Sequence, residues 1–477
     1  MRMLNRHPPS KQRGAALLIM MLVVMVAAIA VLVTRLNQND RRVERLGETQ
    51  DVLAMAKTAL IDYAATYPDL NGDFATRLPC PDIDNSGGLL EGEAHTANCG
   101  VASESMLGRL PWRTLGIEPL KGGGTACLWY VVSGDYKDAA GFSAAMLNAD
   151  TNGQIQLYEI DSATIISGVQ AEQRPVAAII AAMPALNGQV RAAAGSNGAC
   201  SSNYSAANFL DSDLVSGITN ANLSGAADTV DLLAVAAGYR PEHNDRIALI
   251  TRADLARTFS ERHDYDTRMR ALGLAVAECV ANYARSNPGG VDDRRMPWPA
   301  TLGMPDYRPD AAYDDADIGM ISGRLPDIVN DSNLATGNAI GQIMSDCDPV
   351  AVTAWTPQMF SLWRNWKDHF FYAVAESHTP SSAVPSNCVS CLTVNGAGQY
   401  AAIILFANSR LPSLGQLRNS PPIDTDTKSD PTNYAEAVNA SHFPIASGSA
   451  DFLSQASTNS FNDLLFCVDP ILNVTEC

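Results

Sequence analysis

The sequence predicts an α+β fold: a long N-terminal membrane-spanning helix, then two related modules that each place a helix on a mostly antiparallel sheet. Three observations predict this fold. Ala15 to Val33 is a run of nineteen apolar residues without a charge. A helical pattern continues beyond it to Tyr67. Six short blocks then recur in the same order in the two halves of the chain, which indicates an internal duplication.

Composition sets the broad class of the protein. The chain has 477 residues, 46% of them apolar and 18% charged, so it can bury a sizeable core. Its net charge is −18, which argues against nucleic acid as a partner, because that binding depends on Lys and Arg neutralising phosphates. The ten cysteines are an even number and lie mostly in Pro/Gly/Asn-rich segments, which indicates an oxidising compartment.

The first 14 residues form a basic leader. They carry four bases and no acid. As a helix, Ala15 to Val33 would span roughly 28 Å, close to the thickness of a bilayer's hydrocarbon core. Positive charge stays on the cytoplasmic side, so the rest of the chain is expected outside the cytoplasm. A cleaved signal peptide ending near Ala28-Ile29-Ala30 and a plain uncleaved anchor are the alternatives.

The junction between leader and apolar run carries a family resemblance. Lys11-Gln12-Arg13-Gly14, followed by Ala15-Ala16-Leu17-Leu18-Ile19, resembles the leader junction of type IV pilins and type II secretion pseudopilins. The resemblance implies that a prepilin peptidase cuts after Gly14 and methylates Ala15. It also implies a single-pass inner-membrane protein with a periplasmic ectodomain that later enters a pilus or pseudopilus. The implied partners are the peptidase, other minor subunits, the inner-membrane assembly platform and the lipid bilayer.

One position departs from the family pattern. Most members carry Glu at the fifth mature position, which is Ile19 here. Within the family this departure resembles the K-type minor pseudopilin at the filament tip. The sequence therefore predicts a minor pilin or pseudopilin with a structural and recognition role, and not an enzyme. The alternative is a single-span, membrane-anchored periplasmic hydrolase or binding protein.

Residues 15–67 are predicted to form one continuous helix. Arg35 to Tyr67 contains no proline and only one glycine, Gly47. Pro68 is expected to end the helix. Apolar residues recur in it at roughly helical spacing, at Val43, Leu46, Leu53, Met55, Ala56, Leu60, Ile61 and Ala64.

The duplication defines a first module at residues 68–250 and a second at residues 251–477. The second is expected to open with a helix from about Thr251 to Arg285. Four apolar runs bounded by turn residues are predicted as buried strands: Trp129–Ser133, Val176–Ala181, Phe370–Ala375 and Ala401–Ala407. The matched blocks begin at Ala59 and Cys279, Arg77 and Arg295, Gly108 and Gly323, Trp129 and Phe371, Ala177 and Ala401, and at the Gly-Gln-x-Arg blocks of Gly188 and Gly415.

A twelve-residue acidic loop has the spacing of a calcium site. Asp82, Asp84 and Ser86 lie at ligand positions 1, 3 and 5, Gly88 follows, and Glu93 at position 12 can bind bidentately. No other cofactor is suggested, and none is required. The alternative is an Asp/Asn/Gly turn between Cys80 and Cys99. A weaker copy of the pattern runs from Asn148 to Glu159.

The remaining motifs favour structural roles. Cys388 and Cys391 form half a zinc site at best, so a short disulfide is favoured. Cys80–Cys99 and Cys467–Cys477 are further candidate pairs, although connectivity cannot be deduced from sequence. No His-Glu-x-x-His or Gly-x-Ser-x-Gly motif occurs. Trp363, Trp366 and Phe370 fall at helical spacing and are predicted to pack in a core.

Overall fold

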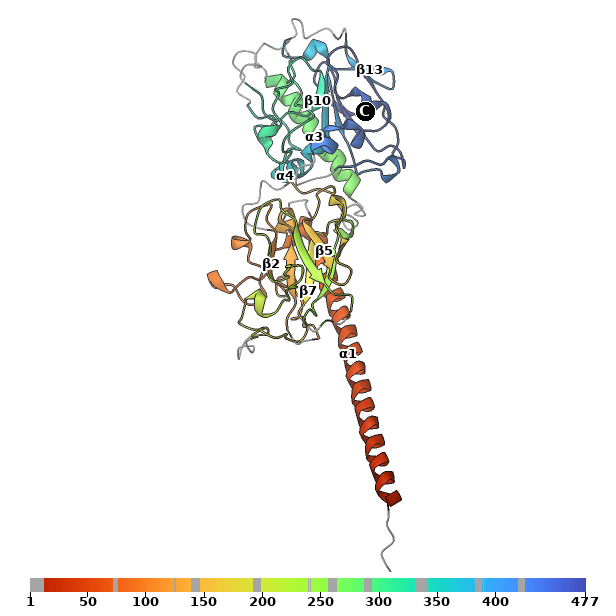
Figure 1. Cartoon of the computed structure of the whole chain (residues 1–477). Helices are drawn as coiled ribbons and strands as arrows, with labels where there is room; N and C mark the ends of the chain where they lie inside the picture. The colour runs from red at the N-terminus through yellow and green to blue at the C-terminus, as the bar shows by residue number, and fades with distance from the viewer. Residues whose placement is uncertain are drawn as a thin grey trace, which may run out of the picture.

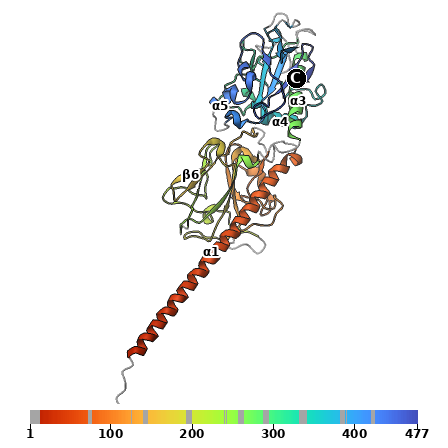
Figure 2. The same ribbon diagram turned by 90° about the vertical axis from the view of Figure 1, so that its right-hand side faces the viewer.

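The chain folds into two units stacked end to end, with one long helix projecting from the first unit (Figures 1 and 2). The computed structural model describes residues 13–71, 76–123, 126–138, 146–191, 199–238, 240, 242–255, 264–286, 294–330, 341–381, 388, 390–418 and 425–477. Residues 1–12 of the predicted leader lie outside this part. The expected domain boundaries at residues 68 and 250 stay predictions.

The first unit packs helix α1 (Arg13–Asn71) on an antiparallel sheet of order β2-β3-β7-β9. A second sheet, of order β6-β5-β8, pairs β5 in parallel with β8. Strands β1 and β4 form a short parallel pair. The strand bounds are β1 Leu78–Pro79, β2 Met106–Arg109, β3 Trp129–Val132, β4 Lys137–Asp138, β5 Ile155–Glu159, β6 Thr164–Ser167, β7 Ala177–Ala181, β8 Asp231–Val235 and β9 Arg246–Ile250.

The second unit repeats this plan. Helix α3 (Tyr265–Ser286) packs on a sheet of order β10-β11-β14-β16-β17, and a smaller sheet has the order β13-β12-β15, with β12 and β15 parallel. Two shorter helices, α4 (Pro357–Trp366) and α5 (Thr425–Ser429), complete it. The strand bounds are β10 Ser322–Arg324, β11 Phe370–Val374, β12 Leu392–Val394, β13 Ala397–Tyr400, β14 Ala402–Phe406, β15 Asp451–Phe452, β16 Leu464–Val468 and β17 Val474–Glu476.

The predicted fold class is wrong in two respects. Within the described ranges, no helix combines the length and the apolar character that crossing a bilayer requires. The sheets are also mixed, because each unit carries a parallel pair in its smaller sheet.

Two details concern the predicted ends of the helices. Pro68 does not end α1 but lies in its last turn, because the helix continues to Asn71. Proline removes the hydrogen bond from its own N–H to the carbonyl four residues earlier, but it leaves its φ helical, so one further turn can follow before the helix ends. The predicted helix from Thr251 to Arg285 is described in two parts, a helical turn at residues 252–255 and α3 from Tyr265; residues 256–263 lie outside the described part.

One strand match is out of register by one residue. The sequence aligns Ala177 with Ala401, but Ala177 pairs with Val132 whereas Ala402 pairs with Val374. Ala177 therefore corresponds to Ala402. A shift of one residue exchanges the two faces of a strand, so the observed register is the one that keeps equivalent side chains on the helix side.

Where the helix meets the sheet, the large side chain comes from the helix in one unit and from the sheet in the other. In the first unit, Leu53 of α1 is buried and Ala248 of β9 packs against the same core. In the second unit the large residue comes from the sheet. A Cβ on Gly273 of α3 would lie 2.0 Å from the ring of Phe466, which is in β16. Glycine is required at this position because the ring occupies the space of a side chain.

Candidate functional site

The N-terminal part of α1 presents a continuous apolar surface. Every described side chain from Leu17 to Ile29 is exposed, and the large ones are between 54% and 71% exposed. Ile19, at the fifth position after Gly14, is one of them at 64%. Gly14 and Ala15 belong to the first turns of α1, and the side chains of Ala15 and Val33 lie outside the described part. An apolar surface of this kind marks a contact with another apolar partner.

The C-terminal part of α1 is fixed to the first unit. Leu53, Ala56, Leu60 and Ala64 are spaced three or four residues apart, so they share one face, and all are buried in the core. The helix therefore changes from an exposed apolar rod to a buried core element along its length (Figure 1).

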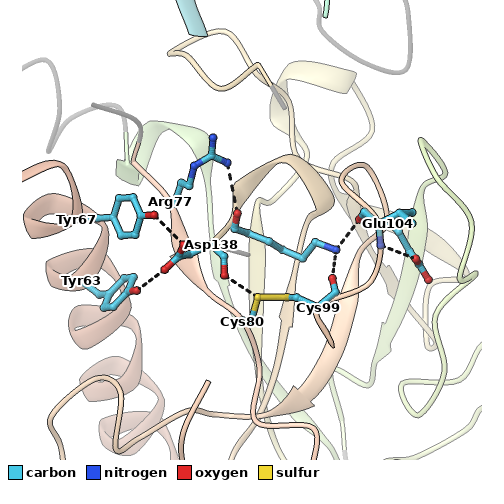
Figure 3. Close-up of a disulfide and its surroundings, with 9 residues drawn as sticks. Tyr63, Tyr67, Arg77, Cys80, Cys99, Glu104 and Asp138 are labelled. Atoms are coloured by element: carbon cyan, nitrogen blue, oxygen red, sulfur yellow. Dashed lines mark hydrogen bonds between the residues drawn. A yellow bond between two sulfur atoms is a disulfide. The ribbon is translucent and has the colours of Figure 1, made fainter. Parts of the chain in front are cut away.

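Polar contacts reinforce the attachment of α1 at two places, beside β9 and at β4. Lys57 Nζ donates to the carbonyl of Leu249 at 2.9 Å and lies 3.0 Å from Asp254 Oδ2. Figure 3 shows the second contact, where the hydroxyls of Tyr63 and Tyr67 donate to Asp138 at 3.0 and 2.7 Å. Burial, and then the nearby charge of Asp138, raises the pKa of Tyr63 well above its usual value. Tyr63 thus remains a donor to Asp138.

The strand that carries Asp138 is braced by a disulfide. Cys80 and Cys99 are bonded, and Lys137 Nζ donates to the carbonyls of Cys99 and Val101, the latter at 2.8 Å (Figure 3). Burial lowers the pKa of Lys137 to about 8. The structure also joins Cys388 to Cys391, Cys467 to Cys477, Cys127 to Cys200 and Cys279 to Cys347. The last two pairs join segments about 70 residues apart, which no local motif indicates.

In the proposed calcium loop, Asp82 forms hydrogen bonds with other residues of the protein. Asp82 Oδ2 accepts hydrogen bonds from the backbone N–H of Gly92 at 2.8 Å and from the hydroxyl of Tyr204 at 3.2 Å. Burial raises the pKa of Asp82 to about 6, although both hydrogen bonds act in the opposite direction. Its Oδ1 atom is buried and accepts no hydrogen bond from the residues that the structure describes.

The other predicted ligands point to different neighbours. Asp84 Oδ1 accepts from the backbone of Ser86 at 2.8 Å and lies 3.3 Å from His95 Nε2, while Glu93 Oε2 accepts from the backbone of Leu90 at 2.8 Å. Gly88 has a φ of +87°, as a turn residue. Among the described residues, no three acidic, His or Cys side chains form a group that could hold a metal. Calcium binding stays a prediction.

The weaker copy of the loop pattern has a different role, which sequence reasoning missed. Its residue Asp150 is 2% exposed and reaches the second unit. Asp150 Oδ1 lies 2.9 Å from Arg410 Nε, and its Oδ2 lies 3.5 Å from Arg418 Nη1 and 3.2 Å from His369 Nε2. Burial raises the pKa of Asp150, but the contact with His369 and the charges of Arg418 and Arg410 hold it well below its usual value. The carboxylate is therefore ionised and paired inside the protein.

Neighbouring residues complete this contact between the units. Asn148 Nδ2 donates to the carbonyl of Asn365 at 2.8 Å and to Asp368 Oδ1 at 2.9 Å. From the first unit, Arg252 Nη1 donates to the carbonyl of Asp150 at 2.9 Å and holds the loop in place. Met146 is 2% exposed and packs in a small apolar cluster with residues of the second unit, Ala300, Met304, Tyr307 and Tyr313.

A second ionic contact joins the units. Arg308 donates two hydrogen bonds to Asp228, at 2.8 and 3.0 Å, and also pairs with Asp306. Asp306 lies in a stretch of the sequence that is rich in aspartate. Asp310 of the same stretch pairs with Lys367 and lies 3.2 Å from Arg364. These acids therefore balance bases within the protein.

Each unit also buries a pair of carboxyl groups. In the first, the backbone N–H of Asp211 donates to Asp245 Oδ2 at 2.8 Å, and the N–H of Asp245 donates to Asp211 Oδ2 at 2.9 Å. Asn220 donates to Asp245 at 3.0 Å and Gln189 to Asp211 at 2.9 Å. Burial, and then the charge of Asp211, raises the pKa of Asp245 to about 8.

The second unit repeats this hydrogen-bond pattern, with Glu436 in the place of Asp211. The N–H of Glu436 donates to Asp463 Oδ2 at 3.0 Å, and the N–H of Asp463 donates to Glu436 Oε2 at 3.1 Å. Asn439 donates to Asp463 at 3.0 Å and Gln416 to Glu436 at 2.9 Å. Gln189 and Gln416 are the glutamines of the two Gly-Gln-x-Arg blocks, so this block is the one sequence feature that could have located the site.

No protein-family model, no curated protein and no solved structure matches the chain. The functional argument therefore depends on the residues of this chain and their geometry.

Proposed function

We propose that this protein is a minor pilin or pseudopilin that stands at or near the tip of a type IV pilus or a type II secretion pseudopilus. Its role is structural and one of recognition. The observation that carries the proposal is α1, whose exposed apolar residues Leu17 to Ile29 project from a body to which the same helix is fixed by its other end (Figure 1).

The exposed part of α1 needs an apolar partner. Thirteen consecutive residues without a charge cannot remain in water at low energetic cost, because each large apolar side chain gains about 1.5–3 kcal/mol on burial. Helices of other subunits, with the same kind of surface, supply such a partner in a filament core. A sustained contact of this kind needs a firmly held helix, which the core contacts of Leu60 and the polar contacts of Lys57 and Tyr63 provide.

The leader resemblance supports the same function. On this proposal Gly14 is the cleavage residue and Ala15 the processed, methylated N-terminus. Ile19 has no carboxylate that could pair with the terminal amine of a neighbouring subunit, as the Glu of most family members would. The protein is therefore suited to one end of a filament and not to the repeating positions within it. Its partners are the prepilin peptidase, other minor subunits and the inner-membrane assembly platform.

The N-terminus of the protein isolated from its own host tests this proposal. The wild type is expected to begin at Ala15 and to carry one extra methyl group by mass spectrometry. Gly14→Glu should leave the N-terminus at Met1 and abolish filament assembly or secretion. Gly47→Glu is the matched control, because Gly47 lies exposed in the same helix with no atom within 4 Å of an added Cβ. It should be processed as the wild type is.

Two outcomes would contradict the proposal. A wild-type N-terminus at Met1, or full function of Gly14→Glu, would favour the anchored hydrolase or binding protein. A terminus near Val31 would indicate a cleaved signal peptide and a secreted protein.

A further inference from the structure

The first unit has a pocket at the open edge of its main sheet. Its volume is about 250 Å³. Strand β2 lies at the edge of this sheet, where it pairs with β3 on one side and bridges to Asp82 through Arg109 on the other. The pocket is lined by Leu107 and Gly108 of β2, Trp129 of β3, Tyr204, Leu223, and a rim that includes Glu104, Ala221 and Asn222.

The second unit fills the equivalent place with its own chain. Phe371 occupies the register position of Trp129, because Arg324 pairs with Phe371 as Arg109 pairs with Trp129. Phe443 is 4% exposed, and its ring lies 5.0 Å from that of Phe371. Its own core cluster therefore includes this additional aromatic ring.

In the first unit Phe209 packs on Trp129 at 5.6 Å, much as Tyr434 packs on Phe371 at 5.4 Å, but the described residues hold no ring in the place of Phe443. Asn220 and Asn439 hold equivalent positions. Each donates a hydrogen bond to a carboxyl pair, and each exchanges hydrogen bonds with the backbone of one residue, Ala234 of β8 or Leu453 just after β15. Four residues further on, the second unit has Phe443 and the first has Ser224. The apolar wall of Trp129 and Leu107 thus faces a pocket where its counterpart faces a phenylalanine.

The edge of β2 is open at the same point. Arg109 turns its backbone outward and exchanges hydrogen bonds with Asp82, at 2.8 and 3.0 Å. In an antiparallel strand the residue two positions away faces the same edge, which is Leu107. Ser322 is the residue of the second unit that corresponds to Leu107. Its side chain holds the segment of Phe443, because Ser322 Oγ donates to the carbonyl of His442 and accepts from the N–H of Ile445. In the described part of the chain, no backbone group forms such a contact with Leu107.

We infer that this pocket binds an extended segment of a partner protein that inserts one aromatic side chain beside Trp129 and lies along the edge of β2 at Leu107. The inference is independent of the proposed filament role. The volume suits the occupant, because an apolar cavity of about 150 Å³ holds a benzene ring. Addition of a strand to an open sheet edge, with a pocket for one side chain, is a recurring mode of peptide recognition.

The chain supplies its own probe for a binding experiment. A fluorescently labelled peptide of residues 438–448, which carries Phe443, is titrated with the full-length protein in a mild detergent and followed by anisotropy. Saturable binding with a micromolar dissociation constant is expected. Replacement of the peptide's phenylalanine by alanine should weaken binding at least tenfold.

Matched protein variants locate the binding site. Ala221→Phe fills the pocket from its rim and should weaken peptide binding at least tenfold. Ala237→Phe makes the same change at an exposed position that does not line the pocket and should leave binding unchanged. Equal binding by the alanine peptide, or by Ala221→Phe with an unchanged melting temperature, would overturn the inference.

Two further results keep the inference testable if Ala221→Phe does not fold. A peptide with benzoylphenylalanine in place of Phe443 should crosslink the wild type within residues 104–108 or 204–225, and crosslinks confined elsewhere would overturn the inference. A homodimer of the wild-type chain that Ala221→Phe dissociates would show that a second copy occupies the pocket, and would equally overturn it.

Discussion

Asp150 is the residue whose replacement tests most directly how the two units are held together. Its carboxylate belongs to the first unit, but its charged partners Arg410 and Arg418, and the ring of His369 beside it, belong to the second. Asp150→Asn keeps the size of the side chain and removes only its charge. The expected result is a large loss of stability and a loosened contact between the units.

The magnitude follows from burial. Arg418 is completely buried and Asp150 is 2% exposed, so solvent cannot replace the lost partner. Removal of one partner from a buried ion pair costs about 3–5 kcal/mol, because the other charge stays buried without compensation. For a unit of 150–250 residues this corresponds to a decrease in melting temperature of about 6–20 °C. The hydrogen bonds of Asn148 and the pair of Arg308 with Asp228 remain and limit the loss.

Calorimetry and small-angle scattering measure the two parts of this prediction. Calorimetry should show a lower melting temperature, and scattering should show a larger radius of gyration if the units separate. Asp161→Asn is the control, because Asp161 pairs with Arg240 on the surface and the same substitution there should leave both measurements unchanged. A melting temperature of Asp150→Asn within about 2 °C of the wild type would refute the argument that this ion pair couples the units.

Three other predictions concern single sites. Folding raises the pKa of Asp245, so the stabilisation from its protonated carboxyl is present at low pH and is lost as the pH rises from about 4 to about 8. In melting curves recorded across this range, the melting temperature of Asp245→Asn should lack this pH-dependent decrease. Leu60→Ala should destabilise the protein by about 2–5 kcal/mol in urea unfolding, because Leu60 is fully buried between α1 and the sheet, whereas exposed Met55→Ala should have little effect. If the loop from Asp82 to Glu93 binds calcium, the ion should raise the melting temperature and a chelator should reverse the rise; an equal rise in Asp84→Asn would contradict that site.

The central strands and helices can be predicted from sequence because their patterns are local. Strands β3, β7, β11 and β14 are buried at every position, and short apolar runs between turn residues indicate such strands. The same property hides their register. A strand buried on both faces shows no alternation of polar and apolar residues, so the one-residue error between Ala177 and Ala401 could not be detected from the residues alone.

The contact between the units could not be predicted for a different reason. Acids and amides spaced two residues apart, as in Asn148 to Asn152, suit a cation and also suit guanidinium groups. The choice depends on what lies opposite, and here Arg410 and Arg418 come from more than 250 residues away in the chain. The same limit applies to the buried pair of Asp211 and Asp245, whose partners are brought together only by the sheet.

The duplication has a consequence for the proposed role in a filament. Both units are built on the same plan, but the exposed apolar helix belongs only to the first; in the second, thirteen of the 22 residues of α3 are buried. A subunit with one such helix has one place for packing in a filament core, so the second unit must lie outside that core. Charged groups buried between the units, led by Asp150, fix its position relative to α1. On this reasoning the second unit adds a rigidly placed surface to the subunit without adding a second point of assembly, as a subunit at a filament end requires.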